Sequence, residues 1–236
     1  MADTFFDDFW RASELDDYTI REFAQRMAAY EADFKTSRLE YASAPEPLPR
    51  VNTLLTRLTT KRKSERAFSE KPLTKRQIAT ILSTGYAWGG LEHRTYPAAG
   101  ALYTVELFQV LFHAEDYGQA ILYYDAEAHG VVRLPQTAPS WPEARGKLNI
   151  DVDGTPQSLV LIVSFPERVT AKYGERGGRF ALLEAGAAMQ QLALTIAGDK
   201  QLKGTAVGGT MDEYWLAQLG LSGIGAQIVL GYLVGR

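Results

Sequence analysis

A lysine and a tyrosine stand side by side in the segment TAKYGERGGRF. Either side chain can act as a general base only if its pKa falls from the ordinary value of about 10. Two nearby cations, Arg176 and Arg179, would favour the deprotonated forms. Adjacent side chains diverge on a regular helix or strand, so we expect an irregular backbone at Gly174 that turns Lys172 and Tyr173 toward one substrate. A solvated, charged loop accounts for the same composition.

A second cluster, RKSERAF, places three cations and a hydroxyl within five residues. Guanidinium groups bind phosphate through planar bidentate hydrogen bonds, and serine adds a directional donor and acceptor. The cluster could therefore hold an anion through Arg62, Lys63, Ser64 and Arg66. The spacing is equally typical of a solvated basic run that precedes a helix.

Two further stretches could bring bare backbone close to a flat ring. In RTYPAAGALY, small residues follow a proline, and glycine permits backbone angles that other residues resist. In GTAVGGTMD, the paired glycines could offer backbone N–H groups to a ligand. A tight turn and an ordinary loop are the respective alternatives. The candidate ring-lining residues are Pro97, Ala98, Ala99, Gly100, Gly208 and Gly209.

Hydrophobic periodicity predicts the scaffold that must position these residues. Strands are expected at residues 105–112, 121–124, 131–134, 158–165 and 227–234, and a long Ala- and Leu-rich helix at 180–196. Thr74 and Gln77 form a capping-box signature that opens a helix ending near Gly85 or the pair Gly89–Gly90. The run SLVLIVSF should be a strand buried on both faces. Helices and strands intermix without βαβ alternation, so the predicted fold class is α+β.

Composition and charge exclude several classes of function. The 236 residues are 46% hydrophobic and 22% charged, as expected of a single globular core. The longest apolar run is far shorter than the roughly 18 residues that span a bilayer, and the acidic start is unlike a signal peptide. A net charge of −3 disfavours nucleic acid as a partner. We expect a soluble, cytoplasmic protein that binds neither nucleic acid nor a membrane.

Cysteine is absent, which removes disulfides, thiolate nucleophiles and Cys-based metal sites. His93, His113 and His129 are scattered without metal-ligand spacing, so no metal site is predicted. The chain divides into an arm with a proline-rich linker at residues 1–50 and a main domain at residues 51–236. The arm is acidic and has near-helical apolar spacing, which predicts one or two amphipathic helices that pack on their own domain or on a twin subunit. Docking of another protein is the alternative role.

Four motifs occur in the order and spacing of the nitroreductase-like flavoproteins: RKSERAF, RTYPAAGALYTVELF, KYGERGGRFALLEAG and GGTMDEYWLAQLGL. The second and third together resemble the SagB-like (McbC-like) azoline dehydrogenases of thiazole- and oxazole-modified peptide and microcin biosynthesis. The resemblance implies a nitroreductase-like α+β fold with a mostly antiparallel sheet flanked by helices, and a homodimer with FMN at the interface. It also implies an azoline-bearing precursor peptide as substrate and association with a cyclodehydratase.

The resemblance assigns a role to each motif. Arg62 and Ser64 would hold the FMN phosphate and ribityl chain, with Lys63 in the same run, and Arg66 would lie at the pyrimidine edge, where a cation stabilises the reduced ring. The turn at residues 97–100, from the partner subunit, and the pair at 208–209 would line the ring system. Arg236 would supply a C-terminal phosphate contact. The chain departs from the pattern at Ala98, Ala187 and Gln191, where the family often has Ser, His and Asn.

In the azoline oxidases a Lys-Tyr pair is the catalytic signature. Lys172 or Tyr173 would take a proton from the azoline ring while a hydride passes to the flavin, and the residues do not show which of the two is the base. One alternative is an NAD(P)H-dependent nitro- or quinone reductase, which would need the flavin but not the pair. Another is a non-catalytic scaffold subunit of a peptide-modifying complex.

Overall fold

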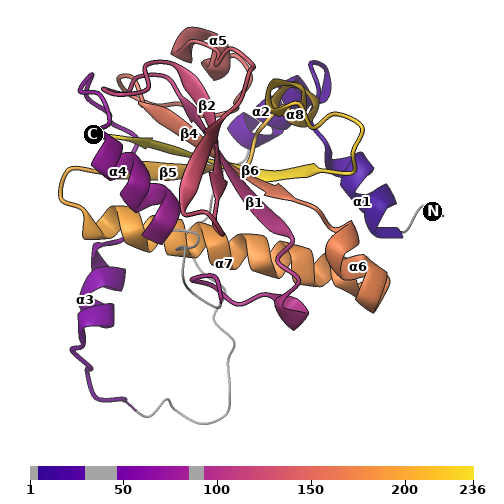
Figure 1. Ribbon diagram of the computed structural model, residues 1–236, viewed down its shortest axis with the longest axis horizontal. Helices are drawn as coiled ribbons and strands as arrows, with labels where there is room; N and C mark the ends of the chain where they lie inside the picture. Colours follow the sequence, from indigo (N-terminus) through magenta and orange to yellow (C-terminus); the bar gives the residue numbers. More distant parts are fainter. Residues whose placement is uncertain (1–4, 30–46, 85–92) are drawn as a thin grey trace.

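The computed structural model describes residues 5–29, 47–84 and 93–236. Its centre is a six-stranded sheet in the order β3-β2-β1-β4-β6-β5, and every neighbouring pair of strands is antiparallel (Figure 1). The strands are β1 (Val105–Leu111), β2 (Ala120–Asp125), β3 (Gly130–Arg133), β4 (Ser158–Ser164), β5 (Lys203–Val207) and β6 (Gln227–Gly235). The predicted α+β class and mostly antiparallel sheet are confirmed.

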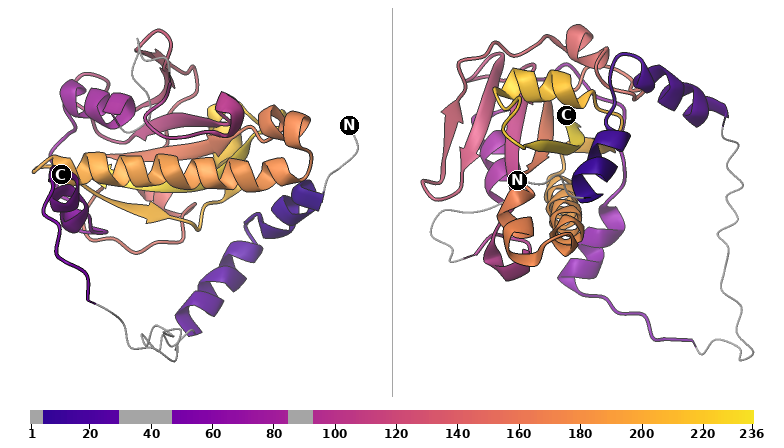
Figure 2. Two further views of the ribbon diagram at one scale, coloured as in Figure 1. Left: turned by 90° about the horizontal axis from the view of Figure 1, so that it is seen from below. Right: turned by 90° about the vertical axis from the view of Figure 1, so that its right-hand side faces the viewer.

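Helices cover both faces of the sheet. They are α1 (Phe5–Ser13), α2 (Thr19–Ala29), α3 (Leu54–Lys61), α4 (Lys75–Ala79), α5 (Trp141–Arg145), α6 (Glu167–Tyr173), α7 (Arg176–Gly198) and α8 (Asp212–Leu219). A π-helical turn, η1 (Thr80–Thr84), continues α4, and a 3-10 turn, η2 (Ala99–Ala101), precedes β1. Helices α4 and α7 lie on one face, and α5 and α8 lie on the other (Figures 1 and 2).

The sheet is buried on both faces because its central strands carry apolar side chains on both sides of the pleat. All seven residues of β4 are buried, as the run SLVLIVSF predicts. One core joins Leu107 and Val160 of the sheet to Leu192 of α7, and the second joins Leu159 to Trp215 of α8. Helix α7 is long and apolar enough to span a membrane by length and composition, but here it packs along the sheet as a core helix.

The predicted capping box of α4 is present. Gln77 N donates to the Thr74 hydroxyl at 3.2 Å, and Thr74 N donates to the Gln77 amide oxygen at 3.1 Å. The two bonds satisfy backbone donors at the helix start. The predicted end of this helix, near Gly85 or Gly89–Gly90, lies outside the described residues.

One local prediction is wrong, and several elements were not predicted. The segment TAKYGERGGRF is not an irregular loop, because its first residues end α6 and residues from Arg176 onward belong to α7. Only Gly174 (φ 56°, ψ −146°) and Glu175 separate the two helices. Residues 203–207 form β5, a strand that was not predicted. Helices α3, α5 and α8 were not predicted either; α5 has only five residues, too few for a periodic pattern.

The N-terminal arm forms two helices, as expected, and both pack on the main domain. At α1, the backbone N–H groups of Phe5 and Phe6 donate to the Glu175 carboxylate at 3.1 and 3.2 Å. The Phe6 ring fills the space beside Gly178, where a built Cβ would lie 2.3 Å from it. The arm is therefore fastened to the start of α7. The division of the chain at residue 50 stays a prediction.

Candidate functional site

Lys172 and Tyr173 are the last two residues of α6. The Lys172 ammonium nitrogen lies 5.2 Å from the centroid of the Tyr173 ring, and that ring stands edge-on to Phe180 at 5.1 Å between centroids. Lys172 is exposed and Tyr173 is half-buried. Both residues belong to the regular helix, and Gly174 ends that helix directly after the pair.

The turn from Pro97 to Gly100 lies against this pair. Gly100 has a left-handed backbone (φ 61°), and a Cβ built on it would lie 2.8 Å from the Tyr173 hydroxyl and 3.1 Å from the Lys172 nitrogen. Both polar tips therefore converge on one backbone position. The structure brings two of the motifs together into a single corner of the molecule, which we call the Lys-Tyr corner: Lys172, Tyr173 and the turn 97–100.

The basic run 62–66 lies at an edge of the sheet and is fixed there by its backbone. Glu65 N donates to Gly204 O at 2.9 Å, and Asp153 N donates to Arg66 O at 2.8 Å. The exposed side chains of Arg62, Ser64 and Arg66 form no hydrogen bond or ion pair with the residues that the structure describes. These groups are available to an anion.

Lys63 differs from its neighbours in this run. Its ammonium group forms an exposed ion pair with the Glu65 carboxylate at 3.1 Å. Arg62 instead lies near Tyr232: burial raises the pKa of that tyrosine, and the positive charge of Arg62 opposes the rise. The run thus presents two guanidiniums and one hydroxyl, with the lysine already neutralised by its neighbour.

The paired glycines follow the end of β5 and play different parts. A Cβ on Gly208 would meet no atom within 4 Å, so its backbone is open to a ligand. A Cβ on Gly209 would lie 2.6 Å from Asn149 Cβ and 3.2 Å from the Phe23 ring of α2. Gly209 is therefore required for packing beneath the arm, whereas Gly208 remains a candidate ring contact.

Arg236 is engaged within its own chain. Its guanidinium donates to Pro72 O at 3.2 Å and to the Gln201 side-chain oxygen at 2.7 Å, and its backbone bonds to Gln157 and Ser69. The side chain fastens the C-terminal strand to the segment after the basic run. A phosphate would have to compete with these bonds, so its predicted phosphate contact finds no support in this geometry.

The two predicted clusters lie at opposite ends of α7 (Figures 1 and 2). Tyr173 packs on Phe180, whereas Arg62 lies near Tyr232, which shares the space beside Gly204 with Ile196. At 1.5 Å per residue, the helix from 180 to 196 is about 24 Å long. Within one chain, the basic run and the Lys-Tyr corner are therefore separated by about the length of this part of α7.

Sequence reasoning missed two buried carboxylates beside the corner. Glu184 of α7 accepts hydrogen bonds from Thr104 N at 3.0 Å, the Thr104 hydroxyl at 2.9 Å and Val105 N at 3.1 Å. It holds the chain where the turn 97–100 enters β1. Glu106 of β1 binds the side chains of Arg94 and Arg168. The available signal was an acidic residue inside an apolar element, because a buried charge requires partners.

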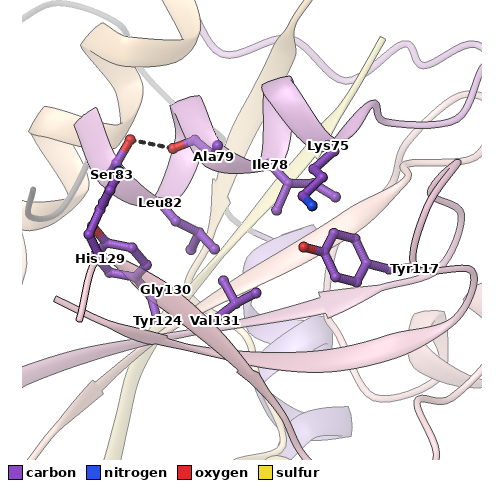
Figure 3. Close-up of a pocket in the computed structure, with 10 residues that line it drawn as sticks. All are labelled: Lys75, Ile78, Ala79, Leu82, Ser83, Tyr117, Tyr124, His129, Gly130 and Val131. Atoms are coloured by element: carbon purple, nitrogen blue, oxygen red, sulfur yellow. Dashed lines mark hydrogen bonds between the residues drawn. The ribbon is translucent and has the colours of Figure 1, made fainter. Parts of the chain in front are cut away.

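A pocket elsewhere contains none of the predicted site residues. It has a volume of about 300 Å³ and lies between α4–η1 and the β2–β3 hairpin (Figure 3). Lys75 and Tyr117 stand at one end, while Ser83, Tyr124 and His129 stand at the other. The Tyr124 hydroxyl and His129 Nδ1 are 2.8 Å apart. In the described parts of the chain, no group of three His, Asp or Glu residues could hold a metal ion.

Comparison with known proteins agrees with the fold. Residues 59–236 match the nitroreductase family, and the chain belongs to that family. A candidate nitroreductase of Methanocaldococcus jannaschii is 29% identical over 137 residues, which are 57% of this chain and 68% of that protein.

Two solved structures share the fold. A chain of the E. coli microcin synthetase McbBCD complex, solved with truncated pro-MccB17 bound, superposes with a TM-score of 0.66 and 19% identity, over 96% of this chain and 85% of that one. A candidate nitroreductase from Desulfovibrio desulfuricans, solved in complex with FMN, superposes with a TM-score of 0.50 and 14% identity, over 78% and 87% of the two chains. The chain is thus similar to flavin-dependent oxidoreductases.

Proposed function

We propose that this protein is an FMN-dependent azoline oxidase, which converts thiazoline or oxazoline rings in a peptide to azoles. The observation that carries the proposal is the Lys-Tyr corner. The polar tips of Lys172 and Tyr173 converge on Gly100, within the turn that is expected to line the flavin ring. A general flavin reductase needs no such pair of proton-accepting side chains.

The residues present fit FMN. Arg62, Ser64 and Arg66 offer exposed donors of the kind that bind phosphate and an anionic ring edge, and no described residue competes for them. Gly208 leaves open space beside its backbone, where a flat ring can approach. The homologous fold solved with FMN supports the same cofactor.

The site is complete only when two chains contribute to it. Within one chain, most of the length of α7 lies between the basic run and the Lys-Tyr corner. That helix also exposes apolar side chains, with Leu183 69% and Leu182 36% accessible. A second copy packed against α7 in the opposite direction would cover these leucines and bring its corner to the first chain's basic run. We therefore propose a homodimer with the flavin at the interface.

The corner supplies the proton chemistry. An azoline loses one ring hydrogen as a proton to Lys172 Nζ or Tyr173 Oη, and either atom can be the base. When bound, FMN would supply the acceptor that takes the other hydrogen as hydride. The turn 97–100 lies against the two polar tips at Gly100 and would keep them together beside a bound ring. Arg176 and Arg179 lie in the first turn of α7, where they line a pocket together with Phe5, Phe6 and Phe9 of α1.

The substrate is proposed to be a precursor peptide presented by a cyclodehydratase. The likeness to the microcin synthetase chain extends over 96% of this protein, including the region of the arm, and that complex was solved with a peptide bound. We place the reaction in the cytoplasm.

Purified protein with FMN bound should convert a thiazoline peptide to a product lighter by two hydrogens per ring, as measured by mass spectrometry. Lys172→Ala and Tyr173→Phe should each lower turnover by on the order of 10²–10⁴-fold while the visible flavin spectrum is retained. Full activity in both variants would exclude the pair as catalytic. Bleaching of the flavin by NADPH, with no reaction of the peptide, would instead indicate an NAD(P)H-dependent nitro- or quinone reductase. Colourless protein that still binds a cyclodehydratase would indicate a non-catalytic scaffold subunit.

A further inference from the structure

Helix α6, which carries the Lys-Tyr pair, is too short to fix the direction of those side chains by itself. It contains seven residues, begins after Pro166 and has no side-chain cap at its start. Helices of this length are not stable alone in water. The orientation of Lys172 and Tyr173 must therefore be set by contacts between α6 and the rest of the protein.

Arg168 makes the polar contact of α6 with the sheet. It lies one turn before Lys172, so the two side chains share a face of the helix. Its guanidinium donates to the Glu106 carboxylate at 2.6 Å and to Tyr103 O at 2.8 Å. It also covers the Phe165 ring, with 4.6 Å from the guanidinium carbon to the centroid. The ion pair joins α6 to β1.

The same carboxylate holds the other side of the corner. Arg94, which opens the segment that leads to the turn 97–100, lies 3.3 Å from both oxygens of Glu106. Its guanidinium also donates to Val105 O and to the Tyr96 hydroxyl, and it covers the Tyr103 ring at 4.8 Å. The Glu106 side chain is only 9% exposed, so these contacts are little screened by water.

We propose that Glu106 is a positioning residue of the azoline oxidase reaction: through Arg168 and Arg94 it sets the distance between the Lys172–Tyr173 pair and the Gly100 turn. The inference rests on the proposed function for its catalytic meaning. The structural part of the proposal is that the Glu106 carboxylate fixes both sides of the corner, and this part can be tested without measuring turnover.

The first measurement is hydrogen exchange of Glu106→Gln, which keeps the shape of the side chain and removes its charge. Exchange should rise at least tenfold at residues 168–173 and 98–103 and stay unchanged in β4 and β6. Ser158→Ala is the matched control. Gln109 lies on β1, as Glu106 does, and its side chain donates to the buried Ser158 hydroxyl of β4 at 3.0 Å, so the control removes a polar contact of the same strand without touching α6. Unchanged exchange at both sides of the corner, or an equal rise in the control, would overturn the proposal.

The second measurement is a double-mutant cycle on turnover. Glu106→Gln should lower kcat at least tenfold at unchanged flavin content, Glu106→Asp should recover part of it, and Glu106→Gln should cause no further loss in a Lys172→Ala background. The same factor in both backgrounds would show that Glu106 does not act through the pair. If wild-type protein oxidises no azoline, the proposed function fails, and the exchange measurement still decides whether Glu106 holds the corner.

Discussion

Gly100 is the residue on which the two halves of the Lys-Tyr corner meet. Its φ of 61° belongs to the left-handed region, which a non-glycine residue enters at a cost of about 1–2 kcal/mol. Any side chain there would also collide with the polar tips of Lys172 and Tyr173. A side chain at this position would therefore meet a backbone cost and would displace the two polar tips.

Gly100→Ala is expected to lower azoline turnover by at least tenfold while FMN stays bound, because the new methyl group displaces the pair. Gly118→Ala is the matched control: its φ is 59°, but its Cβ would meet nothing within 4 Å. Alanine at position 118 would have the same unfavourable backbone conformation but would contact no neighbouring side chain. Equal turnover in the two variants, measured with the same peptide at saturating concentration, would show that the space beside Gly100 is not needed for catalysis.

At the scale of elements, the contact between α1 and α7 depends on Gly178. A methyl group at that position would lie within 2.3 Å of the Phe6 ring, so Gly178→Ala should release α1 from the domain. Limited proteolysis should then cleave within residues 5–29 at least tenfold faster. Gly186→Ala, on the same helix, meets nothing within 4 Å and should leave the arm docked. Similar cleavage of both variants would mean that the arm is held elsewhere.

The start of α8 should make stability depend on pH. Burial raises the pKa of Asp212 to about 7, assisted by nearby Glu14 and opposed by the hydrogen bond from the Thr210 hydroxyl at 2.7 Å. The folded protein therefore holds a proton that the unfolded chain releases near its ordinary pKa. The stabilising contribution of the neutral form is complete below about pH 4 and is lost as the pH rises toward 7.

Asp212→Asn keeps a neutral side chain that can accept the Thr210 hydrogen bond. We expect the free energy of unfolding of the variant minus that of wild type to increase by on the order of 2–4 kcal/mol between pH 4 and pH 7.5, as measured by urea denaturation. The increase arises because wild type loses stability over this range and the variant does not. A constant difference across that range would show that Asp212 is ionised in the folded protein at all of these pH values.

At the scale of the whole molecule, the separation of the two clusters along α7 predicts complementation between inactive chains. Arg62→Ala should lose flavin and Lys172→Ala should lose turnover, so each homodimer is inactive. A mixed dimer contains one site with both residues intact if the site is shared between subunits. Unfolding and refolding the two variants together should therefore restore about a quarter of wild-type activity per chain, from the statistics of random pairing with one intact site per mixed dimer. No recovery, with mixed dimers verified by mass, would place each site within one chain.

Local patterns in the sequence determined five of the six strands of the sheet, the capping box at Thr74 and the motif residues of the nitroreductase family. These features depend on hydrophobic period or on neighbours a few residues apart, which a single sequence displays. The tertiary structure alone decided that Lys172 and Tyr173 end a helix, that their tips converge on Gly100 and that Glu106 holds both sides of the corner. These contacts join residues distant along the chain, and docking of α6 and α7 against the sheet, rather than local propensity, fixes them.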